Sequence, residues 1–566
     1  MKTTRFISRI VFILILISLV LVTGTVKSKA NQTQLGLIAA DSTYSDLVVG
    51  VPGQDIPGSP SPIDQAGAIH WIRGYPTGLG SSGNQTFDQN MDGSDDQAGT
   101  SDQFGNALAS GDFNGDGVYD LAVGIPFEDL LVGSTELINA GAVHVLYGSE
   151  MGGLSFIGDQ FWHQASPGVE GSAEYNDQFG TALAVGNFNG DEFDDLAIGI
   201  PYEDFEYSST IENAGSVVVL YGSVSGLSTS ATLPDQMWHQ DSPAIIDSVE
   251  PYDWFGAALA AGDFDNDDYD DLAIGAPGED SEAASKNDIG VVHVLYGTEN
   301  GLTGARNQQW EQYDWGGSAE SESYDHFGRS LAVGDFKVGG ADDLAIGVPD
   351  EDIEGTTTVT DAGAVNILYG STTGLDDDIV DFIYQDGGYI KEKAEYQDRF
   401  GYTLATVDFS GIGIDELIVG VPFEDLGDPL VFNAGAVHVV IHQSSGWYCS
   451  EGRYLHQGRD NIPDILEQND GFGSSLASGD FNGDGKEDLA IGVPYDSCQA
   501  PGDGSVIVVY DDYWPDPDFP TQQFCQGLNL VDQAEENDHF GLALVSMPSA
   551  GGTSFWNYLP VSMKNH

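Results

Sequence analysis

Basic side chains are scarce in this chain. Its 566 residues include 17 Lys and Arg against 90 Asp and Glu, which gives a formal net charge of −73 at pH 7. A surface of this sign repels phosphate, so we expect no nucleic-acid partner, and anionic membrane surfaces are disfavoured for the same reason. Divalent cations are attracted instead.

Cysteine is also scarce. Cys449, Cys498 and Cys525 are the only three and lie in the last quarter of the sequence. They cannot all pair with one another, and the sequence does not decide which two would pair. One disulfide and one remaining thiol are compatible with an oxidising compartment, but this is no disulfide scaffold.

Long hydrophobic runs are absent beyond the N-terminus. Lys2, Arg5 and Arg9 precede an apolar run over residues 10–22, and Ser28-Lys29-Ala30 follows it. This pattern predicts a signal peptide over residues 1–30, with cleavage after Ala30. An uncleaved anchor is the alternative, although the run is short for a bilayer span. We expect no transmembrane segment after cleavage and a secreted, extracellular or cell-surface location.

Familiar catalytic motifs are missing as well. The sequence holds no GxSxG, HExxH or phosphate-binding glycine loop that stands out. Nine of the 11 histidines occupy positions that recur with the repeat described next. We therefore name no catalytic and no organic-cofactor-binding residues, and we leave open whether the protein is an enzyme.

One pattern dominates what is present. The dipeptide Phe-Gly recurs at intervals of 68–76 residues and opens segments of the type FGxxLAxGDFNGDGxxDLAIGxP. A period this regular indicates one structural unit repeated around or along an axis. The seven copies begin at Phe104, Phe179, Phe255, Phe327, Phe400, Phe472 and Phe540.

Four short elements recur in a fixed order. The first leads to a glutamine, the second begins at Phe-Gly, the third is DLAIGxP and the fourth resembles AGAVHVLYG. All are rich in Val, Ile, Leu, Tyr and Ala and are bounded by Gly, Pro, Asn and Asp, which predicts strands separated by turns. The glutamines that end the first element are Gln89, Gln164, Gln240, Gln312, Gln385, Gln457 and Gln533.

The two ends of the chain complement each other. Residues 46–74 supply a third and a fourth element without a preceding Phe-Gly, whereas Gln533 and Phe540 have no GxP strand after them. Joining these halves completes a blade and removes the open edges that a linear solenoid, the alternative, would expose. We therefore predict an all-β, seven-bladed β-propeller of four-stranded blades over residues 31–548, closed by N- and C-terminal strands in one blade. Residues 549–566 form a separate tail.

An acidic loop separates the second and third elements in four copies; its pattern DxNxDGxxD is intact from Asp112 and from Asp480, the copy from Asp263 is all-carboxylate, and the copy from Asn187 begins with an amide. Side-chain oxygens at positions 1, 3, 5 and 9 and the carbonyl at position 7 suit calcium better than magnesium. A β-turn of Asp, Asn and Gly without metal is the alternative, but four loops in one register favour about four structural calcium ions. The predicted ligands are Asp112, Asn114, Asp116, Val118, Asp120; Asn187, Asn189, Asp191, Phe193, Asp195; Asp263, Asp265, Asp267, Tyr269, Asp271; and Asp480, Asn482, Asp484, Lys486, Asp488.

Two further copies of the loop have lost ligands. The loop at Asp335 carries Lys337 and Gly339 at ligand positions, and the loop at Asp408 carries Ser410 and Ile412. We predict no tight calcium binding at either. None of these loops is an EF-hand, because their flanks are strands and no bidentate Glu occupies position 12.

The Phe-Gly and GxP signatures that flank these loops resemble the FG-GAP repeats of the integrin α-subunit β-propeller. The resemblance covers nearly all of the chain beyond residue 30. It implies calcium in hairpin loops on one face of a seven-bladed propeller and ligand binding by loops on the opposite face. No leg-like domain or membrane anchor follows the repeats in this sequence, so a heterodimeric receptor role is not implied.

These expectations favour a non-enzymatic binding or adhesion module for an extracellular protein or glycan ligand. The stretches after GxP, such as residues 127–139, 202–213 and 350–361, are the expected contact loops. Two alternatives remain open: an extracellular polysaccharide hydrolase or lyase with carboxylates from several blades, and a calcium-dependent structural layer protein.

Two recurrent acidic positions also receive structural predictions. An Asp stands two residues before every Phe-Gly, and we expect it to hold a turn. Glu-Asp pairs follow the GxP strands, and we expect them to be solvated loop carboxylates rather than a cation- or ligand-binding rim.

Overall fold

The computed structural model describes residues 44–548, except residues 59, 92, 95, 150–152, 230–233, 282–285, 313–320, 338–339, 356, 388–389, 391, 444–445, 450–452, 460, 511–519, 529 and 531–532. The predicted signal peptide and the predicted tail lie outside these residues. The described part forms β-strands and no α-helix. None of its elements is a helix long and apolar enough to span a membrane.

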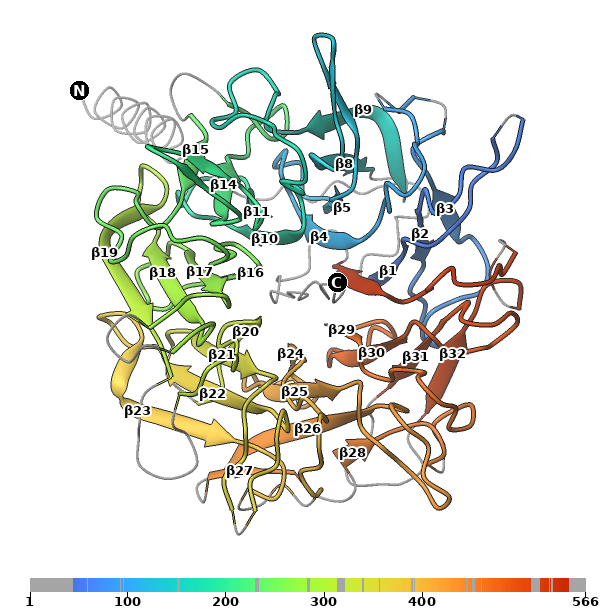
Figure 1. Cartoon of the computed structure of the whole chain (residues 1–566). Helices are drawn as coiled ribbons and strands as arrows, with labels where there is room; N and C mark the ends of the chain where they lie inside the picture. Colours follow the sequence, from blue (N-terminus) through green and yellow to red (C-terminus); the bar gives the residue numbers. More distant parts are fainter. Residues whose placement is uncertain are drawn as a thin grey trace, which may run out of the picture. The chain divides into compact units, whose positions relative to one another are not determined.

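Seven small antiparallel sheets are arranged as a seven-bladed β-propeller (Figure 1). We number the blades along the chain, and each blade is given from its inner to its outer strand. Blade 1 contains β4 (Ala107–Gly111), β5 (Asp120–Ile125), β8 (Ala142–Gly148) and β9 (Leu154–Trp162). Blade 2 contains β10 (Ala182–Gly186), β11 (Asp195–Ile200), β14 (Ser216–Leu220) and β15 (Gln236–Trp238). Blade 3 contains β16 (Ala258–Gly262), β17 (Asp271–Ala276), β18 (Val291–Tyr296) and β19 (Thr303–Trp310).

The remaining blades follow the same plan. Blade 4 contains β20 (Ser330–Gly334), β21 (Asp343–Val348), β22 (Ala364–Tyr369) and β23 (Asp376–Ile383). Blade 5 contains β24 (Thr403–Val407), β25 (Glu416–Val421) and β26 (Ala436–Gln443), and β26 pairs with both β27 (Gly446–Tyr448) and β28 (Tyr454–Leu455). Blade 6 contains β29 (Ser475–Gly479), β30 (Asp488–Val493), β31 (Ser505–Val509) and β32 (Thr521–Phe524). Blade 7 contains β33 (Ala543–Met547), β1 (Asp46–Val51), β2 (Ala68–Ile72) and β3 (Gln85–Phe87).

Blade 7 closes the ring with strands from both ends of the chain, which confirms the predicted closure. β33 pairs with β1 in the register Gly50↔Ala543 to Asp46↔Met547. The inner strand β33 also contacts β4 of blade 1 and β29 of blade 6 (Figure 1). Blade 7 contains three strands from the N-terminal part of the chain and one from the C-terminal part. The sequence analysis had instead predicted two strands from each end.

That difference has a simple origin. The glutamine-ending element is the outer strand of the preceding blade and not the first strand of its own. In blade 6 this strand is β32, and Gln526 lies two residues beyond its last residue. Gln533 was therefore assigned to this role wrongly, and Gln526 takes its place.

The Phe-Gly motif is a packing device between blades. Every Phe of the motif is buried, and Phe104 N donates to Ala66 O of the preceding blade at 2.9 Å. Gly105 has φ +89°, and a Cβ there would lie 2.8 Å from Ala68 O. Glycine is the residue that adopts this conformation at little cost. Apolar side chains of adjacent blades then form shared clusters, such as Val48 and Ile69 of blade 7 with Leu121 and Val123 of blade 1.

The structure also shows how the three cysteines pair. Cys498 and Cys525 form a disulfide within blade 6, between the segment after β30 and the end of β32. Cys449 is a buried thiol outside this disulfide. The composition of one disulfide and one thiol agrees with the sequence argument, which left the pairing open.

Candidate metal centre

The four acidic loops occupy equivalent places in blades 1, 2, 3 and 6. Each connects the inner strand of its blade to the next strand, and position 9 is the first residue of that second strand. In blade 1 the loop joins β4 to β5, and Gly111 pairs with Asp120. The same pairing recurs at Gly186↔Asp195, Gly262↔Asp271 and Gly479↔Asp488.

The side chain at position 1 holds the loop in a tight curl. In blade 1 the Asp112 carboxylate accepts hydrogen bonds from Asp116 N at 3.0 Å and Gly117 N at 2.8 Å. Asp263 and Asp480 accept the equivalent pairs, whereas Asn187 Oδ1 accepts from Asp191 N at 3.1 Å. Positions 1 and 5 are thereby brought together in all four loops.

Positions 3 and 9 close the same site. Asn114 Oδ1 accepts from Asp116 N at 2.9 Å, and Asn114 Nδ2 lies 3.3 Å from Asp120 Oδ2. In blade 6, Asn482 Nδ2 lies 3.1 Å from Asp488 Oδ1. The loop curl thus brings positions 1, 3 and 5 close together, and in blades 1 and 6 the amide at position 3 also contacts the carboxylate at position 9. All four positions carry a side-chain oxygen. An all-oxygen set of this kind fits a hard cation such as calcium.

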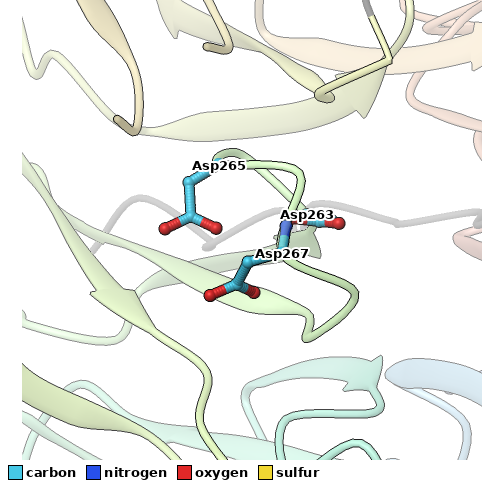
Figure 2. Close-up of side chains that lie close together, drawn as sticks. All are labelled: Asp263, Asp265 and Asp267. Atoms are coloured by element: carbon cyan, nitrogen blue, oxygen red, sulfur yellow. Dashed lines mark hydrogen bonds between the residues drawn. The ribbon is translucent and has the colours of Figure 1, made fainter. Parts of the chain in front are cut away.

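The loop of blade 3 has the highest density of negative charge. Asp263, Asp265 and Asp267 each place a carboxylate oxygen within 4.8 Å of the other two (Figure 2). Arg306 on β19 forms an ion pair with Asp265 and lies over the ring of Tyr296. This guanidinium already balances part of the charge, so a cation entering this loop competes with Arg306.

The Asp at position 9 is fully buried in the four loops. Asp120 Oδ1 accepts from Gly148 N at 2.9 Å, which links the loop to the end of the third strand. Burial raises the pKa of Asp120 to about 8 and that of Asp271 to about 9, because a carboxylate loses hydration there. A divalent ion beside these groups favours their charged forms and offsets the crowding of carboxylates.

The two decayed loops differ from the intact ones. Lys337 Nζ lies 3.0 Å from the ring centroid of Tyr369 on β22, and burial lowers the pKa of this lysine. In blade 5, Ser410 Oγ donates to Asp408 Oδ1 at 2.8 Å, so a hydroxyl replaces a carboxylate or amide oxygen at position 3. The absence of tight calcium at these loops stays a prediction.

Sequence reasoning missed an acidic residue at position 8. This carboxylate reaches the preceding blade and accepts the backbone N–H of position 1 there, as Asp194 Oδ2 does from Asp112 N at 2.7 Å. The adjacent pairs Asp194-Asp195, Asp270-Asp271 and Asp342-Asp343 were the available signal. The contacts are Asp194 with Asp112, Asp270 with Asn187, Asp342 with Asp263, Asp415 with Asp335 and Glu487 with Asp408.

The Asp before each Phe-Gly holds a turn, as predicted. Each carboxylate accepts the backbone N–H of the residue three positions earlier, for example Glu250 N to Asp253 Oδ2 at 2.7 Å. The other pairs are Gly99–Asp102, Glu174–Asp177, Glu322–Asp325, Glu395–Asp398, Glu467–Asp470 and Glu535–Asp538.

The glutamates after GxP were expected to be solvated, and this was wrong. Glu128, Glu203, Glu279, Glu351 and Glu424 are at most 5% exposed. Each accepts a hydrogen bond from a buried glutamine of the preceding blade, as Glu351 does from Gln312 Nε2 at 2.9 Å. They lie at the end of the second strand opposite the acidic loop and tie neighbouring blades together.

Comparisons with known proteins agree with this architecture. The FG-GAP repeat model matches residues 104–146, 179–220, 255–295 and 472–509. These segments belong to blades 1, 2, 3 and 6, which are the blades with intact acidic loops.

Curated relatives include human phosphatidylinositol-glycan-specific phospholipase D, 27% identical over 67% of this chain and 41% of its own length. Integrin alpha pat-2 of Caenorhabditis briggsae is 30% identical over 44% of this chain and 18% of its own length. The matched regions thus span less than half of these relatives. A solved rhamnogalacturonan lyase, YesW, aligns over 91% of this chain and 93% of its own with 11% identity and a TM-score of 0.31. This chain is therefore a protein with FG-GAP repeats, and it resembles integrin α subunits over several of them.

Proposed function

We propose that the chain is a secreted or cell-surface calcium-binding propeller that acts as a non-enzymatic binding or adhesion module for a protein or glycan ligand. The calcium part is supported by one observation: the acidic loops of four blades share one curl, in which the side chain at position 1 accepts the backbone N–H of position 5, and all four carry side-chain oxygens at positions 1, 3, 5 and 9. In each loop the carbonyl at position 7 would be a further ligand. The ions would stabilise the loops, because binding free energy at such sites adds to folding free energy.

The ligand surface that we propose lies at the other end of the blades. The second strand of each blade runs from the acidic loop to the segment after GxP, so these two features lie at opposite ends of the strand. In blade 1 this segment forms the hairpin of β6 (Leu130–Val132) and β7 (Thr135–Leu137), and in blade 2 that of β12 (Phe205–Glu206) and β13 (Thr210–Ile211). Leu131 on β6 is 75% exposed. Val132 and Ile138 in the same segment are also exposed, and several exposed apolar side chains on one loop held by a rigid scaffold support a role in binding.

Binding of the purified chain to glycan and matrix-protein arrays tests this proposal. The assay is run in millimolar calcium and again in chelator, with folding followed by circular dichroism. We expect specific binding that is lost in chelator together with the folded state. No binding on any surface would contradict the adhesion role.

A pair of variants tests the proposed surface. Leu131→Ser should weaken the binding at least about fivefold, because the loss of a central interface contact costs more than about 1 kcal/mol. The matched control is Ile157→Ser on β9, an apolar side chain that is 85% exposed but lies outside the hairpins after GxP. Equal binding by both variants would contradict a contact at the β6–β7 hairpin.

A further inference from the structure

Seven equivalent glutamines lie at the joints between blades. In every blade one outer-strand residue pairs with the second residue of the third strand, and the glutamine lies two positions after that outer-strand residue. Examples are Trp162 opposite Val143, which is followed by Gln164, and Leu455 opposite Val437, which is followed by Gln457. The equivalent pairs in the other blades are Trp238–Val217, Trp310–Val292, Ile383–Val365, Phe524–Val506 and Phe87–Ile69.

At six joints the glutamine Nε2 donates to the side chain that follows the GxP turn of the next blade. The acceptors are five glutamates and, in blade 7, Gln54. The six bonds are Gln89–Glu128, Gln164–Glu203, Gln240–Glu279, Gln312–Glu351, Gln385–Glu424 and Gln526–Gln54, all 2.5–2.9 Å long.

The joint between blades 5 and 6 is the exception. Its acceptor position holds Asp496, whose backbone makes the equivalent bonds: Asp496 N donates to Val493 O, and Gly504 N donates to Asp496 O. Asp is one methylene shorter than Glu, so its carboxylate lies about 1.5 Å farther back. Gln457 is fully buried, and neither Oε1 nor Nε2 has a hydrogen-bond partner among the described residues.

Asp496, which stands where the other joints place the acceptor of the glutamine, belongs to a cluster of carboxylates. Glu467, Asp470 and Asp496 each place an oxygen within 4.8 Å of the other two. Asp470 and Asp496 are each 1% exposed, whereas Glu467 is half-buried and leaves a route from solvent. On this face of the propeller, the structure describes no second group of three carboxylates as close as this one.

These features match the requirements of a hard cation. Two oxygens that both ligate calcium at about 2.4 Å are at most about 4.8 Å apart. Buried carboxylates at such separations need a positive partner, and buried amides need a hydrogen-bond or ligand partner. Gln523 Nε2 donates to Asp464 at 2.9 Å and lies 3.4 Å from Asp496 Oδ2, which meets only part of this need. The donors are all oxygen, which does not suit zinc.

We propose that Gln457 Oε1, Glu467, Asp470 and Asp496 form a calcium site at the joint between blades 5 and 6, on the face opposite the acidic loops. The ion takes the place of the glutamine–glutamate hydrogen bond that holds the other joints. This site is separate from the four loop sites and does not depend on them.

The number of calcium ions bound per chain tests this site. Purified full chain and variants are dialysed against calcium chloride, and bound calcium is measured by atomic emission. Asp496→Glu keeps every charge and restores the hydrogen-bond partner of Gln457, and we expect it to bind one ion fewer than the wild type. Asp470→Asn should also bind one ion fewer.

Asp253→Asn is the matched control for Asp470→Asn. Asp253 holds the equivalent turn in blade 3, where the Gln240–Glu279 bond is intact, and we expect this variant to bind as many ions as the wild type. The test compares the calcium count of each variant with that of the wild type. Its result therefore remains valid whether or not the four loops bind calcium. If Asp470→Asn does not fold, Asp496→Glu decides alone. A count for Asp496→Glu equal to that of the wild type would overturn the proposal.

Discussion

At the scale of single residues, the buried glutamates at the blade joints determine how the protein responds to pH. Burial, together with nearby carboxylates such as Asp177, raises the pKa of Glu203 from its ordinary value of 4.5 to about 9. Glu203 therefore retains its proton at neutral pH. Gln164 Oε1 has no hydrogen-bond donor among the described residues, so it is available to this proton while Gln164 Nε2 donates to Glu203.

The direction of the pH effect follows from this shift. The unfolded chain releases the proton of Glu203 near pH 4.5, whereas the folded chain holds it up to about pH 9. Stability from this group is thus complete below pH 4.5 and is lost as the pH rises through 9. In that interval each such glutamate lowers the free energy of unfolding by about 1.4 kcal/mol per pH unit.

Glu203→Gln should remove this dependence at one joint. We expect the variant to be more stable than the wild type by about 3 kcal/mol at pH 7 and to match it near pH 4. The midpoint of urea unfolding at the two pH values measures the difference. Glu136→Gln, on the exposed hairpin strand β7, is the control for the loss of one charge. A stability gain that is the same at both pH values would contradict a protonated Glu203.

At the scale of single elements, the acidic loops can be compared with one another because the chain contains its own controls. In blade 6 the Asp480 carboxylate accepts from Asp484 N and Gly485 N, and in blade 5 the Asp408 carboxylate accepts from Ile412 N and Gly413 N. The two aspartates hold their loops in the same way. They differ in the other ligand positions.

Asp480→Ala should therefore remove one bound calcium ion, because it deletes a ligand from an intact loop. Asp408→Ala removes the same two backbone contacts from a decayed loop and should leave the calcium count unchanged. Isothermal titration calorimetry of both variants measures the number of sites. Equal calcium loss in the two variants would show that the effect comes from loop disruption and not from a lost ligand.

The disulfide of blade 6 is the second element whose contribution can be measured. It closes a loop across 27 residues between Cys498 and Cys525. A cross-link of this length stabilises by about 3.5 kcal/mol in the chain-entropy model. We expect Cys498→Ser/Cys525→Ser to lose about this amount in denaturant unfolding. Cys449→Ser is the control, and an unchanged unfolding midpoint in the double variant would contradict the contribution.

At the scale of the whole molecule, the repeat period was sufficient to predict the number of blades and the closure of the ring. It could not determine where one blade ends and the next begins, because a periodic sequence can be divided at any point. For that reason Gln533 received the role that Gln526 has. The phase is set by pairing between strands, such as β1 with β33, and this contact spans almost the whole chain.

The candidate sites were predictable to different degrees. The acidic loops are local, so their residue spacing predicts which oxygens come together. The proposed site at Gln457 combines residues of blades 5 and 6, and Gln457 and Asp496 lie about 40 positions apart in the sequence. This site becomes apparent only when the seven equivalent joints of the structure are compared. The position-8 carboxylates likewise accept hydrogen bonds from a neighbouring blade. The spacing of residues within one repeat cannot predict these partners, because they belong to a different repeat.

The central claim is that calcium holds this highly acidic ring together. The most direct test is thermal unfolding of the purified chain in chelator, in millimolar calcium and in the same concentration of magnesium, which controls for screening of the net charge of −73. Ligands that bind only the folded state raise its stability by mass action. We predict that calcium raises the Tm by at least about 5 °C over chelator and that magnesium does not reproduce this rise. Equal Tm values in calcium and magnesium would contradict the account.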